Sequence, residues 1–225
     1  MDKFECKLVV MKKVIGIVLA MFSFSCQSKE KEVIVPQIKE PVKMDIQEGM
    51  ELATFAGGCF WCTEAVFLEL NGVKSVVSGY IGGKTVNPTY AEICNGDTGH
   101  AEAIRITFDP KKISFGELLE IFFGTHDPTT LNRQGNDIGT QYRSEIFYHN
   151  EAQKTLSEDY IALMTKENTF GKPIVTKISA APKFYEAEEY HQNYYNQNKT
   201  QGYCSYVITP KIEKLKKVYK DKLKK

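Results

Sequence analysis

The sequence predicts an α+β domain, built as a two-layer mixed β-sheet with flanking helices. Segments typical of strands, with β-branched or alternating apolar residues, alternate along the chain with segments of helical periodicity. Some of the connections are long and polar, such as the one from Thr125 to Thr140. Because long loops on a rigid scaffold often carry function, we expect these loops to gather around a site.

The first half of the domain is expected to contain three strands and a helix. An apolar run ended by glycines, "ELATFAGG", predicts a strand and a tight turn, after which Cys59 opens a helix that reaches about Leu70. The run "GVKSVVSGYIGG" is β-branched and bounded by glycines, and "AEAIRITFDP" alternates apolar and polar residues before a proline. Both patterns indicate strands.

The second half begins with the clearest helix signal in the chain. In "SFGELLEIFFGTHDP", Ser114 and Glu117 have the spacing of a capping box ahead of an apolar helix face. The remaining segments are predicted, in order, as a strand, a helix, a strand, a helix and a second helix: "QYRSEIFYH", "NEAQKTLSEDYIALMTKEN", "PIVTKIS", "EAEEYHQNYYNQ" and residues 212–225.

The C-terminal segment, residues 212–225, is basic. Its apolar residues recur near helical spacing with lysines between them, which is typical of an amphipathic helix with a solvated face. Contact with an anionic membrane surface is the alternative. The whole chain of 225 residues nevertheless has a formal net charge of only +1, which argues against a nucleic-acid-binding protein.

Residues 1–26 have the pattern of an export signal and are not expected to belong to the fold. Lys12 and Lys13 precede an apolar run, Val14 to Phe24, that has the length of a signal-peptide core and is too short to span a bilayer. Cys26 follows closely, and the arrangement resembles a bacterial lipoprotein signal, in which the cysteine is acylated after cleavage. A plain secretory signal is the alternative.

Residues 27–51 are predicted to be a flexible tether. The segment is rich in charge, contains two prolines and shows no sustained period of a strand or a helix. With lipid on Cys26, it would hold a domain of residues 52–211 at a membrane of the bacterial cell envelope. With a plain secretory signal, the protein would be periplasmic.

The stretch "GGCFWCTE" contains the strongest chemical signal in the chain. Gly57 and Gly58 allow a tight turn, and the N–H groups of a helix start would stabilise a thiolate at Cys59. This predicts a reactive nucleophile. Two structural cysteines, a metal half-site, and a thioredoxin-like disulfide exchanger using Cys59 and Cys62 are the alternatives. No metal is expected, because no second pair of soft ligands has a zinc-type spacing.

Five motifs, in matching order, resemble those of the A-type peptide methionine sulfoxide reductases. They run from about Leu52 to Lys211 and read "GGCFWCTE", "GYIGGKTVNPTYAEICNGDTGHAEAIRITFDP", "HDPTTLNRQGNDIGTQYRSEIFYH", "FYEAEEYHQNYY" and "GYCSYVITPK". The resemblance implies a ferredoxin-like fold, reduction of methionine S-sulfoxide both free and in proteins, and a role in the repair of oxidised proteins. It also implies a monomer without a cofactor, whose disulfide is reopened by thioredoxin or a thioredoxin-like reductant.

The same resemblance implies roles for particular residues. Cys59 would be the nucleophile, and Glu102 would protonate or hydrogen-bond the sulfoxide oxygen. The other implied roles are Phe60 and Trp61 around the substrate methyl group, Tyr90 and Tyr142 as hydrogen-bond partners of the oxygen, and Asp137, His191 and Tyr194 as residues that position the methionyl backbone.

A second thiol must attack the sulfenic acid that would form on Cys59. Members of this family resolve it through the second cysteine of "CFWC" or through the cysteine of "GYC", and this chain has both, Cys62 and Cys204. Cys62 lies one helical turn away, whereas Cys204 follows a polar stretch with the composition of a mobile loop. We expect Cys204 to be essential and Cys62 to take part, while Cys94 is expected to be a small buried residue.

Glu64 closely follows the two cysteines of "CFWC". A carboxylate in the first turn of a helix is explained by capping and by the helix dipole alone. We therefore predict a structural role for Glu64.

Overall fold

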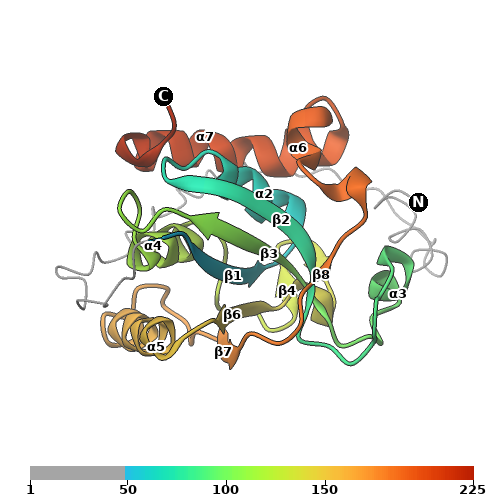
Figure 1. Cartoon of the computed structure of the whole chain (residues 1–225), viewed down its shortest axis with the longest axis horizontal. Coiled ribbons are helices and arrows are strands. Elements are labelled where there is room, and N and C mark those ends of the chain that lie inside the picture. Colours follow the sequence, from blue (N-terminus) through green and yellow to red (C-terminus); the bar gives the residue numbers. More distant parts are fainter. Residues whose placement is uncertain (1–48) are drawn as a thin grey trace, which may run out of the picture. The chain divides into compact units, whose positions relative to one another are not determined.

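The computed structural model describes residues 49–225. Its centre is a six-stranded mixed sheet in the order β7-β6-β1-β3-β2-β8, flanked by helices (Figure 1). This confirms the predicted α+β class; the predicted leader, Cys26 and nearly all of the predicted tether lie outside the described residues. The strands are β1 (Glu51–Gly57), β2 (Val73–Ile81), β3 (Ala101–Phe108), β6 (Ser144–Tyr148), β7 (Lys177–Ala180) and β8 (Tyr185–Glu186).

Alternation along the strands separates the two faces of the sheet. All strand pairs are antiparallel except β6 with β7, which is parallel. Phe55 on β1 lies opposite Ile104 on β3 and Ile146 on β6, and all three belong to the large hydrophobic core. Their chain neighbours Ala56 and Phe147 belong to a second, smaller cluster. The sheet is therefore buried on both faces in its centre.

Helix α2 (Phe60–Leu68) is the central helix of the domain. Its residues from 60 to 67 are all buried, because it packs on β1, β2 and β3 and is in turn contacted by the helices α4 (Phe115–Thr125), α6 (Tyr194–Gln197) and α7 (Thr209–Val218). Figure 1 shows α7 running beside α2, while α5 (Glu151–Lys166) lies at the β6 and β7 end of the sheet. A helix buried on all sides can hold its first turn rigidly.

The predicted capping box at Ser114 is confirmed. The Ser114 hydroxyl accepts the backbone N–H of Glu117 at 3.2 Å, and the Glu117 carboxylate accepts the backbone N–H of Ser114 at 2.8 Å. Helix α3 (Tyr90–Asn95) begins in the same way with Thr89 and Glu92.

The helix predicted for "EAEEYHQNYYNQ" is wrong. This segment forms β8, the 3₁₀ turn η2 (Glu189–His191) and the four-residue helix α6, with Asn193 in a left-handed conformation between the last two. The Gln192 side chain accepts the N–H of Ser78 and donates to its carbonyl, both at 3.0 Å. These bonds to the edge of the sheet override the local helix propensity.

The boundaries predicted for the C-terminal helix, residues 212–225, are also wrong. Helix α7 begins earlier, after the π-helical turn η3 (Cys204–Ile208), and is followed by the 3₁₀ turn η4 (Lys220–Lys222). Ile212 and Leu215 are buried, and Leu223 forms a β-bridge with Leu70. The C-terminal segment is thus an integral part of the domain core.

The long connection between α4 and β6 carries local structure that the sequence did not indicate. A two-stranded hairpin, β4 (Arg133–Gln134) with β5 (Asp137–Ile138), is followed by the 3₁₀ turn η1 (Thr140–Tyr142). The strand predicted for "PIVTKIS" begins later than expected, with β7 at Lys177. Across residues 49–225, none of the helices has both the length and the apolar character needed to cross a membrane.

Candidate active site

Cys59 occupies the junction between β1 and α2. It is the N-cap residue of α2 and is 1% exposed, while the backbone N–H groups of Cys62 and Thr63 bond to its carbonyl at 3.1 and 3.4 Å. The turn needs Gly58, because its φ is +91° and a Cβ there would lie 2.5 Å from the Gln134 side chain. A thiol at a helix N-terminus is stabilised as the thiolate by the helix dipole.

Glu102 lies beside this first turn of α2. The residue is fully buried on β3, and its Oε2 accepts the backbone N–H of Phe60 at 3.0 Å. Since Phe60 directly follows Cys59, the fold brings the predicted acid next to the predicted nucleophile. Strand β3 supplies the acid, and the turn after β1 supplies the thiol.

Tyr142 also faces this pair. Burial raises the pKa of the Tyr142 phenol, and so does the negative charge that Glu102 and Cys59 can carry nearby. The phenol therefore keeps its proton and can donate a hydrogen bond near Glu102 and Cys59.

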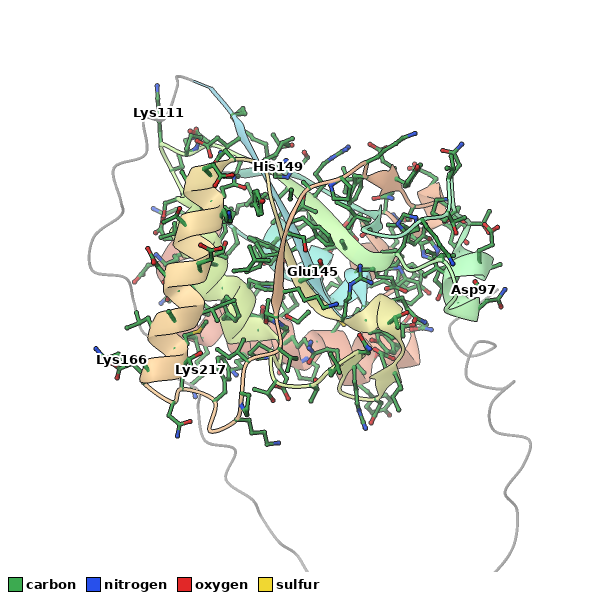
Figure 2. All side chains as sticks on the ribbon, turned by 90° about the horizontal axis from the view of Figure 1, so that it is seen from below. Asp97, Lys111, Glu145, His149, Lys166 and Lys217 are labelled. Atoms are coloured by element: carbon green, nitrogen blue, oxygen red, sulfur yellow. The ribbon has the colours of Figure 1, made fainter. Side chains whose placement is uncertain are left out.

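A buried ion pair fixes the turn that carries Tyr142. Arg143 binds the Glu145 carboxylate at 2.5 Å and donates to the carbonyls of Thr140 and Gly99, each at 3.1 Å. The Ser179 hydroxyl donates to the other Glu145 oxygen at 2.7 Å. Figure 2 labels Glu145, a residue of β6, near the centre of the view. This network ties η1 to the sheet and so limits the movement of Tyr142.

Aromatic rings surround the first turn of α2. Trp61 stacks on Tyr194 with ring centroids 3.7 Å apart and an interplanar angle of 6°, and its indole N–H donates to Nδ1 of His191 at 3.1 Å. The His191 ring also lies 5.1 Å from Phe60 and 4.4 Å from Tyr90. Five residues predicted from the sequence therefore form one aromatic cluster.

Glu188 connects two of the tyrosines in this region. Its carboxylate accepts the Tyr80 hydroxyl and the backbone N–H of Tyr90, both at 2.8 Å. Neither Glu188 nor Tyr80 was identified from the sequence. Glu188 stands in the acidic run "EAEE", which resembles an ordinary solvated stretch, and only the fold reveals its partners.

Tyr203 links Asp137 to Cys62. Its hydroxyl donates to Oδ2 of Asp137 at 2.6 Å and lies 3.7 Å from the Cys62 sulfur. The Tyr203 ring also meets the edge of Trp61, with centroids 6.1 Å apart. Sequence reasoning missed Tyr203, although its place directly before the predicted resolving cysteine was a usable signal.

Cys204 does not lie in a loop, as its polar neighbours had suggested. It begins the π-helical turn η3 and is fully buried in the main core, because the turn continues directly into α7. Residues 202 and 203 are already helical. Cys94, predicted to be buried, is half-buried in α3 and packs against the same core.

Glu64 has a different environment from the one predicted. It lies beyond the first turn of α2, is 1% exposed, and its Oε1 accepts the backbone N–H of Asn193 at 2.8 Å. Capping and the helix dipole therefore do not explain it. Its partner is the bend between η2 and α6.

The arrangement is suited to redox chemistry of a thiol. It combines a sulfur atom at a helix N-terminus with a buried carboxyl group, phenols and a wall of aromatic rings. The carboxyl group and the phenols could polarise an oxygen, and the rings could enclose an apolar group. Among residues 49–225, no group of three or more His, Cys, Asp or Glu side chains is arranged so that it could hold a metal ion.

Comparison with known proteins identifies relatives of the whole domain. Residues 51–223 match the family model described as peptide methionine sulfoxide reductase. The chain is 58% identical to a protein of Deinococcus radiodurans named peptide methionine sulfoxide reductase MsrA, over 77% of this chain and 84% of the relative. The protein of that name from Acinetobacter baumannii is 57% identical, over 74% of this chain and 94% of the relative.

Solved structures of this family have the same fold. Mxr1 from Saccharomyces cerevisiae in reduced form matches with a TM-score of 0.63 and 39% identity, over 69% of this chain and 89% of that chain. Methionine sulfoxide reductase A of Corynebacterium diphtheriae matches with a TM-score of 0.62 and 33% identity, over 78% and 88% of the two chains. The chain thus belongs to the peptide methionine sulfoxide reductase family of enzymes.

Proposed function

We propose that this enzyme reduces the S epimer of methionine sulfoxide, both free and in proteins, and so repairs oxidised proteins. The observation that carries the proposal is the position of Cys59 at the N-terminus of α2, beside the fully buried carboxyl group of Glu102 and within a wall of aromatic rings. Membership of the family supports the reaction class.

The first step transfers oxygen from the substrate to Cys59. The thiolate attacks the sulfoxide sulfur and forms a bond between the two sulfur atoms while the oxygen takes a proton. The hydroxyl group then passes from the substrate sulfur to the Cys59 sulfur as the S–S bond breaks, which leaves methionine and a sulfenic acid on Cys59. The cysteine sulfur is oxidised by two electrons and the substrate sulfur is reduced by two. Burial favours the neutral form of a carboxylic acid, so Glu102 is suited to supply the proton.

The surrounding residues bind and orient the sulfoxide. Phe60 and Trp61 enclose its methyl group, which explains why two aromatic residues separate Cys59 from Cys62. Tyr90 and Tyr142 hydrogen-bond the oxygen; the raised pKa of Tyr142 keeps its phenol in the donor form. The residues proposed to position the methionyl backbone are Asp137, His191 and Tyr194.

A second cysteine closes the catalytic cycle. Its thiol attacks the Cys59 sulfenic acid, which forms a disulfide and releases water. Cys204 is the proposed essential resolver, and Cys62 takes part because it lies one turn from Cys59 and contacts Tyr203. Thioredoxin or a thioredoxin-like dithiol then reduces the disulfide.

Separate assays of the two epimers test the proposal. Purified protein is incubated with dithiothreitol and either the S or the R epimer of a methionine sulfoxide peptide, and free methionine sulfoxide is tested in the same way. We expect turnover of the S epimer alone. Equal turnover of both epimers contradicts the stereochemical assignment. Reduction of insulin disulfides without any sulfoxide turnover instead favours a disulfide exchanger using Cys59 and Cys62.

The proposal includes a site of action at the bacterial cell envelope. The mature protein would begin at Cys26, carry lipid on that residue and extend from the membrane on residues 27–51. The chain is expressed in a host that processes lipoproteins, and intact mass and detergent partitioning are measured. A water-soluble product that starts after Cys26 identifies a plain secretory signal, and an uncleaved cytosolic product rules out export.

A further inference from the structure

Glu64 is a buried acid that the proposed reaction does not use. Its Oε1 accepts the backbone N–H of Asn193 at 2.8 Å, and the backbone N–H of Tyr194 and the hydroxyl of Ser78 face the same carboxyl group. Within residues 49–225, no ion pair neutralises Glu64. A carboxyl group that is 1% exposed and accepts a backbone N–H without an ion pair is costly to bury, so its position needs a specific explanation.

The bend that Glu64 holds is unusual for a residue other than glycine. Asn193 has a φ of +50°, a left-handed conformation, at the point where η2 ends and α6 begins. On one side of the bend, Gln192 is fixed to the backbone of Ser78. On the other side, Tyr194 begins α6. The hydrogen bond from Asn193 to Glu64 therefore fixes the direction in which Tyr194 leaves the bend.

The same segment covers Trp61 from two sides. The Tyr194 ring stacks on the indole with centroids 3.7 Å apart, and His191 accepts the indole N–H at 3.1 Å. Glu64 stands three residues after Trp61 on α2, so the two side chains project from neighbouring positions on the helix. The segment from His191 to Tyr194 is thus attached to α2 at both Trp61 and Glu64.

We infer that Glu64 is a positioning residue for substrate binding: its carboxyl oxygen holds the bend at Asn193, and the bend holds Tyr194 against Trp61. The contact between Trp61 and the substrate rests on the proposed function, whereas the packing of Tyr194 on Trp61 does not. Loss of the acceptor oxygen releases Tyr194 from the indole and loosens the pocket wall without altering the reacting groups.

The protonation state of Glu64 does not remove this role. Burial raises the pKa of Glu64 to about 7, although the hydrogen bond from Asn193 and the nearby Tyr194 N–H and Ser78 hydroxyl work to lower it. Near neutral pH the carboxyl group is therefore present in both forms. Each form keeps an oxygen that can accept the Asn193 N–H, and the amide of glutamine has one as well.

Four variants of the full chain separate this role from general stability. Glu64→Ala removes the acceptor, Glu64→Asp keeps the charge but withdraws the acceptor by one methylene, and Glu64→Gln keeps the acceptor without the charge. Gln153→Ala is the matched control. Gln153 is also fully buried and donates from its side chain to the carbonyl of Leu52, but it lies on α5.

The first measurement needs no substrate. Trp61 is the only tryptophan in the sequence and is 2% exposed. Quenching of tryptophan fluorescence by acrylamide therefore measures directly how accessible its indole ring is from solvent. We expect stronger quenching in Glu64→Ala and Glu64→Asp, and wild-type quenching in Glu64→Gln and Gln153→Ala.

The second measurement is steady-state and single-turnover reduction of a methionine S-sulfoxide peptide. In Glu64→Ala and Glu64→Asp, KM should rise about 5-fold, or roughly 1 kcal/mol at 1.4 kcal/mol per tenfold, as expected for a lost aromatic stack. The single-turnover rate at saturating substrate should stay within about 2-fold of wild type, because the Cys59 site is intact.

The outcomes are distinguishable. Wild-type quenching in Glu64→Asp, or equal quenching in Glu64→Ala and Gln153→Ala, overturns the inference; Glu64→Asp decides the question if Glu64→Ala does not fold. Quenching in Glu64→Gln as strong as in Glu64→Asp also overturns it, because the charge and not the acceptor would then matter. If wild type reduces no sulfoxide, the proposed function fails while the quenching results still decide the positioning role.

Discussion

The phenol oxygen of Tyr203 lies 3.7 Å from the sulfur of Cys62, on an element 141 residues further along the chain. The same hydroxyl donates its proton to Asp137 at 2.6 Å. Because a phenol has only one proton to donate, its contact with Cys62 must be one in which the oxygen accepts. Tyr203 therefore connects a proposed substrate-binding carboxylate with a proposed resolving thiol.

The substitution Tyr203→Phe should lower the stability of the domain. It removes the hydrogen bond to the buried Asp137, and a hydrogen bond to a charged group is worth about 1.5–3 kcal/mol. Denaturant unfolding of the reduced protein measures the loss. Tyr206→Phe is the matched control, because Tyr206 lies in the same helical turn but is 85% exposed; its effect should stay below about 0.5 kcal/mol. Equal effects of the two substitutions would contradict the assigned importance of the bond.

The substitution Glu102→Gln should slow the first chemical step. An amide still accepts the Phe60 N–H but cannot donate a carboxyl proton, and a positioned acid is worth about 10² to 10⁴ in rate. Single-turnover reduction of the S-sulfoxide, followed with thiol titration, separates the rate from the presence of Cys59. Glu92→Gln, at an exposed capping acid of α3, should keep the wild-type rate. A wild-type rate in Glu102→Gln removes Glu102 from the mechanism.

Burial of Glu64 should make the domain less stable as the pH rises. Its pKa is about 7 in the folded protein, against an ordinary value of 4.5. The favourable contribution is complete below pH 4.5 and is lost as the pH rises through 7, because the unfolded chain ionises first. Relative to wild type, Glu64→Gln should therefore gain stability with increasing pH, by on the order of 3 kcal/mol, from about 1.4 kcal/mol for each pKa unit.

The pH dependence of the free energy of unfolding checks this prediction, and Glu117 is its control of opposite sign. Burial works to raise the pKa of Glu117, but the bonds from Lys222 and Ser114 outweigh it and lower the pKa. Its contribution is present above the ordinary pKa and is lost as the pH falls, so Glu117→Gln should lose stability relative to wild type as the pH rises. Parallel pH profiles for the two variants would contradict both assignments.

The sequence predicted the elements whose signals are local. Strands such as β1 and β3 and the capped helix α4 follow from periodicity and from the Ser114 capping box, which depend on residues within a few positions of one another. The motif around Cys59 likewise predicted a turn between a strand and a helix. These signals were enough to predict the class of fold and to propose Cys59 as the nucleophile.

The errors concern residues whose conformation depends on distant partners. The segment from Glu186 to Gln197 has helical composition, yet it is bent by bonds from Gln192 to Ser78 and from Asn193 to Glu64, across more than one hundred residues of chain. Tyr203 reaches Asp137 across 66 residues of chain, because Asp137 lies in the β4–β5 hairpin that the sequence did not indicate. No pattern within a short window reports such contacts, so these residues appear only in the structure.

The last prediction concerns the order of the disulfide relay. Cys62 is one turn from Cys59, with its backbone N–H bonded to the Cys59 carbonyl at 3.1 Å. A bridge between them requires local distortion of the first turn but no long movement. Cys204 is fully buried at the start of η3, and we expect its participation to be accompanied by local unwinding of η3. A π-helical turn is a suitable place for this, because its hydrogen bonding is less regular than that of the α-helix that follows.

We expect both movements to occur in sequence, with Cys204 in the final disulfide. One equivalent of S-sulfoxide is added to the reduced protein without reductant, and the disulfides are located by peptide mapping. The bridge should contain Cys204, and hydrogen exchange of residues 202–208 should increase while that of α7 around Ile212 and Leu215 stays slow, because those side chains remain in the core. If the map contains only Cys59 joined to Cys62, and Cys204→Ser keeps full thioredoxin-dependent turnover, then Cys62 alone completes the cycle and η3 is simply part of the helix that packs on α2.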